Sequence, residues 1–338
     1  MSPVPTPLSV LIAGDHFVTP DLVADALRAR IGPSFTARTV TLPWPYTPFG
    51  PVAEVDEASD AEDEMIAALS GVEVAVTQMG PFTARVLAAA DALRLLVVCR
   101  GGPVNVNLAA AAEAGVEVRS TPGRNAVAAA EHTVALLLAA LRQIPQRHEG
   151  LRDGAWRSDL YALDEVGAEL GGSTVGLVGY GAIGRRVGRI LRAFDAEVLV
   201  HDPYADLATL DGAIPADLPE LLDRCTVLSL HARLTAETAG MIGAKELSRL
   251  PRGAVLVNTA RGGLLDYDAV VDALESGQLG AAALDVFDAE PLPAGSRLRT
   301  APRVVLTPHL AGATRQTAER AAALAADAVA EHLAGRSR

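Results

Sequence analysis

Three side chains of different chemistry each follow a short apolar run in the second half of this chain. They are Arg261, Glu290 and His309. The runs, at residues 254–258, 281–286 and 304–306, have the length and the largely apolar content of buried strands. Ligands bind beyond the carboxyl ends of parallel strands in α/β proteins. We therefore expect the three side chains to gather at one edge of a sheet.

An arginine, a carboxylate and a histidine together suit hydride transfer to a 2-keto acid. A guanidinium holds a carboxylate through two parallel hydrogen bonds. Imidazole exchanges a proton near neutral pH, and a neighbouring carboxylate orients the ring and stabilises its charged form. We assign Arg261 to substrate binding and carbonyl polarisation, His309 to acid–base catalysis and Glu290 to support of His309. Taken singly, each residue could instead be structural, as an ion-pair, turn or strand-end residue.

The chemistry needs a cofactor, and residues 173–202 indicate one. In order, they predict a strand, a turn with the sequence GYGAIG at residues 179–184, a helix and a second strand, which Asp202 follows. In that context the glycines predict a turn that cradles a dinucleotide pyrophosphate at a helix N-terminus. Asp202 falls near the usual spacing of about 20 residues for the acid that binds a ribose 2′-OH. A carboxylate would repel a 2′-phosphate, so NAD is favoured over NADP; the alternative is a tight turn without a ligand. The residues assigned to the cofactor here are Gly179, Gly181, Ala182, Ile183, Gly184 and Asp202.

The elements that position these residues alternate between strand and helix along the whole chain, which is typical of parallel α/β sheets. The first 120 residues lack the glycine motif and are assigned to the substrate. We expect a proline-rich loop at residues 43–51, an acidic helix at 56–69 and a long helix at 125–142. A polar, glycine-interrupted connection at 147–170 is interpreted as an arm that wraps a neighbouring subunit. The last helix, at 316–333, should pack through an alanine stripe.

Composition narrows the class of protein. A length of 338 residues suggests two domains. The net charge of −12, without a basic run, argues against nucleic acid or an anionic membrane as a partner. Cys99 and Cys225 lie far apart, which predicts neither a disulfide framework nor a metal site. No basic region or long apolar run opens the chain, so we expect a soluble, cytoplasmic protein. The chain ends soon after its last helix, and no appended regulatory domain is expected.

Four motifs in order resemble those of the D-isomer-specific 2-hydroxyacid dehydrogenases. They are GYGAIG at 179–184, NTARGGL at 258–264, ALDVFDAEP at 283–291 and TPHLAG at 307–312. The resemblance implies two Rossmann-like, doubly wound parallel-sheet domains. An NAD domain at 122–310 would be inserted into a discontinuous substrate domain made of 1–121 and 311–338. It also implies catalytic roles for Arg261, Glu290 and His309, and a homodimer.

The resemblance assigns further contacts. Asp285 is expected to meet the nicotinamide carboxamide, and Gly101 and Gly102 to offer N–H groups to the substrate carboxylate. The residues expected to line the cofactor are Ala232, Arg233, Thr238 and Ala260. Arg233 departs from the proline usual in the family, and a solvated surface side chain is the alternative interpretation. Arg100 precedes a loop that lacks the acids common in relatives. We therefore hypothesise that Arg100 binds a second anionic group of the substrate, a phosphate or a sugar-acid carboxylate.

The sequence thus predicts an NAD-dependent oxidoreductase acting on a D-2-hydroxy acid or its 2-keto acid. Candidate substrates are 3-phosphoglycerate, glycerate or hydroxypyruvate, glyoxylate and other sugar acids. One alternative is an NAD-sensing, co-repressor-like scaffold with the same fold, and another is a formate- or phosphite-type dehydrogenase. The identity of the acid and the physiological direction of the reaction stay open.

Overall fold

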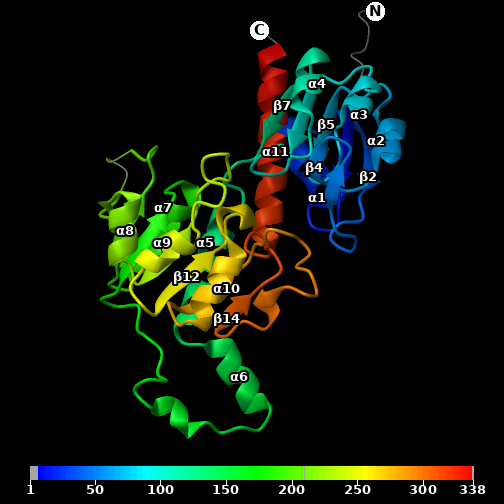
Figure 1. The fold of residues 1–338 in the computed structure, drawn as a ribbon. Coiled ribbons are helices and arrows are strands. Elements are labelled where there is room, and N and C mark those ends of the chain that lie inside the picture. Colours follow the sequence, from blue (N-terminus) through cyan, green and yellow to red (C-terminus); the bar gives the residue numbers. More distant parts are fainter. Residues whose placement is uncertain (1–6, 207, 209, 337–338) are drawn as a thin grey trace, which may run out of the picture. The chain divides into compact units, whose positions relative to one another are not determined.

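The structure is a computed structural model, and it describes residues 7–206, 208 and 210–336. The chain divides into two compact units, each drawn in Figure 1. Unit 1 contains Met1–Asn125 and Ala313–Arg338, and unit 2 contains Ala126–Gly312. Unit 2 is thus inserted into unit 1 along the sequence. Both units are α/β, each built on a parallel sheet, so the predicted fold class is confirmed.

Unit 1 is built on a five-stranded parallel sheet in the order β2-β1-β5-β6-β7. The order reverses between β1 and β5, which makes the carboxyl ends of these two strands the topological switch point. Helices α1 and α11 cover one face, where the alanines of α11 are buried as predicted. Helices α2, α3 and α4 cover the other face. The bounds are β1 Leu8–Gly14, α1 Pro20–Ile31, β2 Phe35–Thr41, α2 Glu62–Leu69, β5 Val74–Thr77, α3 Ala84–Ala88, β6 Leu95–Val98, α4 Leu108–Glu113, β7 Glu117–Ser120 and α11 Arg315–Arg336.

The predicted helix at residues 56–69 is wrong in its first part. Residues there form an antiparallel hairpin of β3 (Gly50–Val52) and β4 (Val55–Ala58), and the helix α2 begins only at Glu62. The hairpin buries its own small apolar cluster of Val52, Val55 and Ala58. Glu57 has a φ of +44°, which a right-handed helix does not allow.

Unit 2 contains a seven-stranded parallel sheet in the order β10-β9-β8-β11-β12-β13-β14. Helices α5 and α7 pack on one face, and α8, α9 and α10 pack on the other. The order reverses at β8, the strand that precedes the glycine motif. The bounds are α5 Ala126–Leu141, β8 Thr174–Val178, α7 Ala182–Arg192, β9 Glu197–His201, β10 Ile214–Pro215, α8 Leu218–Arg224, β11 Val227–Leu230, α9 Ala244–Arg249, β12 Ala254–Asn258, η3 Gly262–Leu264, α10 Tyr267–Glu275, β13 Leu279–Leu284, η4 Arg297–Arg299 and β14 Val304–Leu306.

The segment expected as an extended connection contains a helix that the sequence did not predict. Helix α6 spans Ile144–Arg152 and begins with Pro145 in its first turn, where a proline costs no hydrogen bond. A short 3₁₀ turn, η1 (Ser158–Tyr161), follows. Figure 1 shows this green segment standing away from the rest of unit 2. In the described residues, no single helix is long and apolar enough to cross a membrane; α5 and α6 pass that test only as a pair bent by 63°.

Candidate active site

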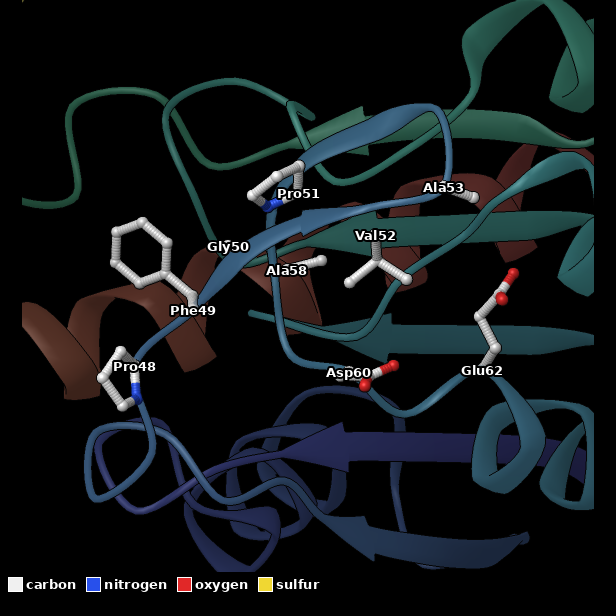
Figure 2. A pocket seen from close by; sticks show the side chains of 9 residues that line it. All are labelled: Pro48, Phe49, Gly50, Pro51, Val52, Ala53, Ala58, Asp60 and Glu62. Atoms are coloured by element: carbon white, nitrogen blue, oxygen red, sulfur yellow. The ribbon is translucent and has the colours of Figure 1, made fainter. Parts of the chain in front are cut away.

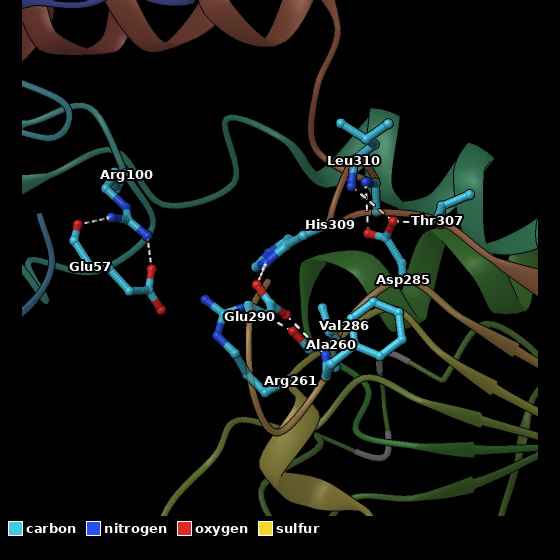
Figure 3. Close-up of polar contacts among 12 residues, drawn as sticks. Glu57, Arg100, Ala260, Arg261, Asp285, Val286, Glu290, Thr307, His309 and Leu310 are labelled. Atoms are coloured by element: carbon cyan, nitrogen blue, oxygen red, sulfur yellow. Dashed lines mark hydrogen bonds and ion pairs between the residues drawn. The ribbon is translucent and has the colours of Figure 1, made fainter. Parts of the chain in front are cut away.

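Arg261, Glu290 and His309 gather at the carboxyl edge of the unit 2 sheet, as Figure 3 shows. They follow the adjacent strands β12, β13 and β14. Nδ1 of His309 lies 2.7 Å from Oε2 of Glu290, and Oε1 of Glu290 accepts the backbone N–H of Phe287 at 2.9 Å. The His309 and Glu290 side chains are 35% and 24% exposed. Glu290 therefore fixes the ring of His309 while the ring stays within reach of a ligand.

Arg261 is held by the turn that follows β12. Asn258 is fully buried, and its side-chain amide donates to the carbonyl of Arg261 at 3.0 Å. Its side-chain oxygen accepts the N–H of Ala260 at 3.0 Å. A Cβ at Gly262 would lie 1.9 Å from the carbonyl oxygen of Phe287, so only glycine fits there. The exposed guanidinium donates to the carbonyl of Ala260 at 2.7 Å. The role of Asn258 was not predicted, although a buried polar residue at a strand end is a usable signal.

The turn that carries His309 is built on Asp285. His309 has a φ of +55°, an uncommon conformation for a residue other than glycine. Its N–H donates to the carbonyl of Asp285 at 2.8 Å. The fully buried Asp285 carboxylate accepts the N–H groups of Leu310 and Ala311, both at 2.8 Å, and the Thr307 hydroxyl at 2.6 Å. Asp285 thus positions His309, and its predicted contact with a nicotinamide carboxamide stays a proposal.

His132 on α5 completes this buried network and was not assigned a role from the sequence. Its Nε2 lies 3.2 Å from the Thr307 hydroxyl and 3.5 Å from Oδ1 of Asp285. Burial acts to raise the pKa of Asp285, but the hydrogen bonds from His132, Thr307 and the backbone outweigh it and lower that pKa. Asp285 is therefore an ionised anchor for the His309 turn.

The glycine motif forms a close-packed turn that leaves a helix N-terminus open. Gly179 has a φ of +96°, and a Cβ there would lie 2.5 Å from the backbone nitrogen of Ala232. A Cβ at Gly184 would lie 2.4 Å from the carbonyl oxygen of Gly179. Gly181 faces open space and gives α7 an N-cap without a side-chain hydrogen bond. With Ala182 and Ile183 opening the helix, these N–H groups suit a pyrophosphate.

Asp202 joins the end of β9 to this turn. Its Oδ2 accepts the N–H of Tyr180 at 2.7 Å, and its Oδ1 accepts the N–H of Tyr204 at 2.9 Å. Each carboxylate oxygen can accept a further hydrogen bond. The side chain therefore lies at the end of the second strand, where dinucleotide-binding domains carry the acid that binds the ribose. The backbone of the glycine turn holds it there.

The residues that follow β11, beginning with His231 and Ala232, pack against Gly179 of the glycine turn. Burial lowers the pKa of His231 to about 4, so this ring is neutral at physiological pH. The Thr238 hydroxyl donates to the carbonyl of Arg233 at 2.6 Å and accepts the N–H of Thr235 at 2.8 Å. Thr238 thus shapes a local turn, and Arg233 is exposed. The cofactor contacts expected of these two residues stay predictions.

Arg100 in unit 1 already has an anionic partner. Its Nη2 contacts the carboxylate of Glu57, and its Nη1 donates to the carbonyl of Glu57 at 3.0 Å (Figure 3). Only 13% of the Arg100 side chain is exposed. Arg100 thus has a carboxylate partner within the chain, and its binding of a second anionic group of the substrate stays a hypothesis. The adjacent Gly101 and Gly102 have open space at their Cβ positions.

Asp15, just past β1, is a buried carboxyl with a perturbed pKa. Burial raises the pKa of Asp15 to about 6, although the N–H groups of Phe17 and Val18 and the charge of Arg124 act to lower it. The unfolded carboxyl ionises near pH 4, so the folded state loses stability as pH rises from about 4 to 6. The loss is about 3 kcal/mol.

Asp15→Asn should remove this loss. We expect the variant to gain about 2 kcal/mol over the wild type between pH 4 and pH 8, because only the wild type must ionise a buried carboxyl and part of its total loss has already occurred at pH 4. Urea unfolding of both proteins at the two pH values measures the gain. A stability difference that is the same at both pH values would show that Asp15 ionises normally in the folded state.

A shallow hollow in unit 1 contains none of the predicted site residues. It has a volume of about 420 Å³ and is lined by the β3–β4 hairpin with Asp60 and Glu62 (Figure 2). Glu62 is engaged by the Thr83 hydroxyl and by Arg85, so we assign no chemistry to this hollow. Among the described residues, no group of three or more His, Cys, Asp or Glu side chains could hold a metal ion.

The doubly wound sheet and the glycine turn at its switch point define unit 2 as a dinucleotide-binding α/β domain. Residues 134–311 match the model of the D-isomer specific 2-hydroxyacid dehydrogenase NAD binding domain, which covers more than half of the chain. The chain belongs to this family, and unit 2 contains its NAD-binding domain.

Three similar proteins illustrate the range of the family. D-3-phosphoglycerate dehydrogenase from Mycobacterium bovis is 39% identical over 81% of this chain and 51% of its own length. Glyoxylate reductase from Aeropyrum pernix is 39% identical over 71% of this chain and 73% of its own. The crystal structure of the TT0316 protein from Thermus thermophilus has a TM-score of 0.81 at 33% identity, covering 96% of this chain and 97% of that one. The chain thus spans about half the length of the first of these curated relatives.

Proposed function

We propose that this protein is an NAD-dependent oxidoreductase of D-2-hydroxy acids and 2-keto acids. The observation that carries the proposal is the Glu290–His309 pair at 2.7 Å, at the same sheet edge as Arg261. Unit 2 supplies the dinucleotide turn on the same sheet. Similarity to named dehydrogenases and reductases supports the reaction class.

The proposed mechanism assigns one task to each side chain. When bound, NAD supplies or accepts the hydride at the substrate C2. Arg261 binds the substrate carboxylate through its guanidinium. In reduction, protonated His309 gives the proton of Nε2 to the carbonyl oxygen, which completes the alcohol; in oxidation the proton returns to the ring. Glu290 holds Nδ1 and stabilises the imidazolium.

The cofactor preference is proposed from the residues at the end of β9. Asp202 presents a carboxylate beside the glycine turn. It can accept a ribose hydroxyl and would repel a 2′-phosphate. We therefore propose NAD as the preferred cofactor.

For the substrate, we propose that Gly101 and Gly102 of unit 1 offer N–H groups to its carboxylate.

We also propose that the protein is a homodimer in the cytoplasm. The segment that follows α6 in unit 2, residues 153–170, carries large apolar side chains that a single chain leaves exposed, among them Trp156 at 83%, Tyr161 at 89% and Leu163 at 92%. A second copy of the chain could cover them. Both cysteines are buried and free, which suits a reducing compartment. Sedimentation equilibrium measures the assembly, and a monomer at micromolar concentration would contradict the dimer.

A substrate panel tests the proposed reaction. Initial rates are measured with glyoxylate, pyruvate, hydroxypyruvate and 3-phosphohydroxypyruvate, each with NADH and with NADPH. We expect turnover of at least one 2-keto acid and a higher kcat/KM with NADH. Tight NADH binding without any turnover would favour the scaffold alternative, and turnover of formate or phosphite alone would favour the formate- or phosphite-type dehydrogenase.

A further inference from the structure

Two backbone segments at the carboxyl edge of the unit 2 sheet carry two of the proposed catalytic side chains. The arginine turn is defined here as residues 258–263, at the end of β12, and the glutamate loop as residues 286–290, after β13. The two segments pack directly on each other, because a Cβ at Gly262 would lie 1.9 Å from the carbonyl oxygen of Phe287. Whatever fixes the backbone of one segment therefore bears on the other.

A buried tyrosine hydroxyl contacts both segments. Tyr267 is the first residue of α10, and only 9% of it is exposed. Its hydroxyl donates to the carbonyl of Val286, in the glutamate loop, at 2.6 Å. The side chain of Asn258, in the arginine turn, hydrogen-bonds to the same hydroxyl and acts to lower the pKa of Tyr267. One oxygen atom thus joins the two segments.

The surroundings keep this hydroxyl protonated. Burial raises the pKa of Tyr267, and the negative charges of Asp288 and Glu290 act in the same direction and outweigh the hydrogen bond from Asn258. A neutral phenol has one hydrogen to donate, and the carbonyl of Val286 receives it. The bond to the glutamate loop is therefore complete throughout the neutral pH range.

The rest of Tyr267 is held by helix and ring contacts. The carboxylate of Asp266 caps α10 by accepting the N–H of Ala269 at 3.1 Å. The N–H of Asp266 donates to the carbonyl of Ile242, also at 3.1 Å. The ring centroids of Tyr267 and Phe287 lie 6.3 Å apart, at an interplanar angle of 39°. A helix N-terminus therefore fixes the position from which the hydroxyl reaches the loop.

The peptide group that receives the tyrosine hydrogen bond also holds Glu290. The carbonyl of Val286 and the N–H of Phe287 belong to one peptide unit, which is planar and moves as a rigid group. That N–H donates to Oε1 of Glu290 at 2.9 Å. Oε2 of Glu290 lies 2.7 Å from Nδ1 of His309 (Figure 3). Three hydrogen bonds in series therefore connect the Tyr267 hydroxyl to the His309 ring.

We propose that Tyr267 is a positioning residue for the reaction. Its hydroxyl fixes the plane of the peptide unit between Val286 and Phe287, and that plane holds the Glu290 carboxylate in place for His309. This inference rests on the proposed function and deepens it, because it assigns a residue of α10 to the orientation of the catalytic pair.

Hydrogen exchange tests the positioning role without any turnover. Tyr267→Phe removes the hydroxyl and keeps the ring. We expect amide exchange of a peptic fragment that covers the glutamate loop to become about tenfold faster or more, because the peptide plane loses its fixed partner. Unchanged exchange of this fragment overturns the proposal.

Gln278→Met is the matched control for a lost buried hydrogen bond. The Gln278 side chain donates to the carbonyls of Leu247 and Leu250 at 3.0 and 2.8 Å. It directly precedes β13, at the opposite end of this strand from the glutamate loop. Exchange of the glutamate loop in Gln278→Met should stay within about twofold of the wild type. An equal acceleration in both variants would mean general loosening of unit 2 and would overturn the proposal.

Steady-state kinetics test the effect on the reaction. With the best 2-keto acid, Tyr267→Phe should lower kcat about tenfold, because the catalytic pair loses its alignment. KM and NADH affinity should stay within about twofold, because Asn258 still binds the backbone of the arginine turn. Rates are expressed per site counted by NADH titration, so that unfolded protein does not imitate a lower kcat. An unchanged kcat, or a loss confined to KM, overturns the assignment.

A double-mutant cycle tests the route through Glu290. If the hydroxyl acts by holding this carboxylate, it has little left to position in Glu290→Gln. We therefore expect Tyr267→Phe to lower kcat less than about twofold in that background. The same tenfold loss in both backgrounds overturns the route. Absent turnover in the wild type would refute the proposed function instead, and the exchange experiment would then decide the role of Tyr267 by itself.

Discussion

His309→Gln should reduce kcat by about 10²- to 10⁴-fold, the range expected for a lost general acid. Glutamine keeps the size and one hydrogen bond to Glu290 but cannot give up a proton. The turn at His309 is fixed by backbone N–H groups bound to Asp285, so the variant should keep its fold. Steady-state rates with the best 2-keto acid measure the loss, and NADH titration should show an affinity within about twofold of the wild type.

The chain supplies a matched control for this variant. His332 in α11 of unit 1 also pairs through Nδ1 with a glutamate, Glu117, at 2.7 Å. His332→Gln removes the same kind of pair away from the proposed site and should leave kcat within about twofold. A kcat for His309→Gln within tenfold of the wild type would refute the role assigned to the imidazole.

Arg261→Lys should lower kcat/KM by roughly 10²-fold, because an ammonium replaces two parallel hydrogen bonds to the carboxylate with a single point contact. The loss should appear in both KM and kcat, since the clamp binds the acid and also aligns its carbonyl. Buried Asn258 and the close fit of Gly262 hold the backbone of this turn independently of the side chain. The fold should therefore tolerate the change.

Arg297→Lys provides the corresponding control. Arg297 lies on the surface of unit 2 and pairs with Asp272 and Glu275. Its replacement should leave kcat/KM unaltered within error. If Arg261→Lys retained wild-type KM and kcat, carboxylate binding would have to be assigned to another group.

The dinucleotide turn is the part of the molecule that local sequence specifies most fully. Between Thr174 and His201 the expected strand, turn, helix and strand are all present. A Cβ at Gly179 or at Gly184 would clash with backbone atoms, and Gly179 also has a positive φ, whereas a Cβ at Gly181 would meet open space. Such a unit is predictable because its contacts are short in sequence and its special conformations need glycine.

At residues 56–69, the local sequence pattern predicts the wrong secondary structure for the first residues. The composition of this stretch suits an amphipathic helix throughout. The first residues instead pair with Gly50–Val52, and Glu57 reaches Arg100, more than forty positions along the chain. Helix propensity amounts to a few tenths of a kcal/mol per residue, which the partly buried Glu57–Arg100 contacts and the pairing of β3 with β4 outweigh.

The α/β class, the dinucleotide turn and the order of three polar side chains after three strands can be predicted from the sequence alone. Periodicity and turn chemistry encode those features within a few tens of residues. The pairing of Glu290 with His309 was also expected, but its geometry, the place of Asp285 under the His309 turn and the contact of Glu57 with Arg100 come from the tertiary structure. These contacts depend on which strands are neighbours and on how loops cross the sheet edge. No local pattern carries that information, because the distances are set by packing between distant segments.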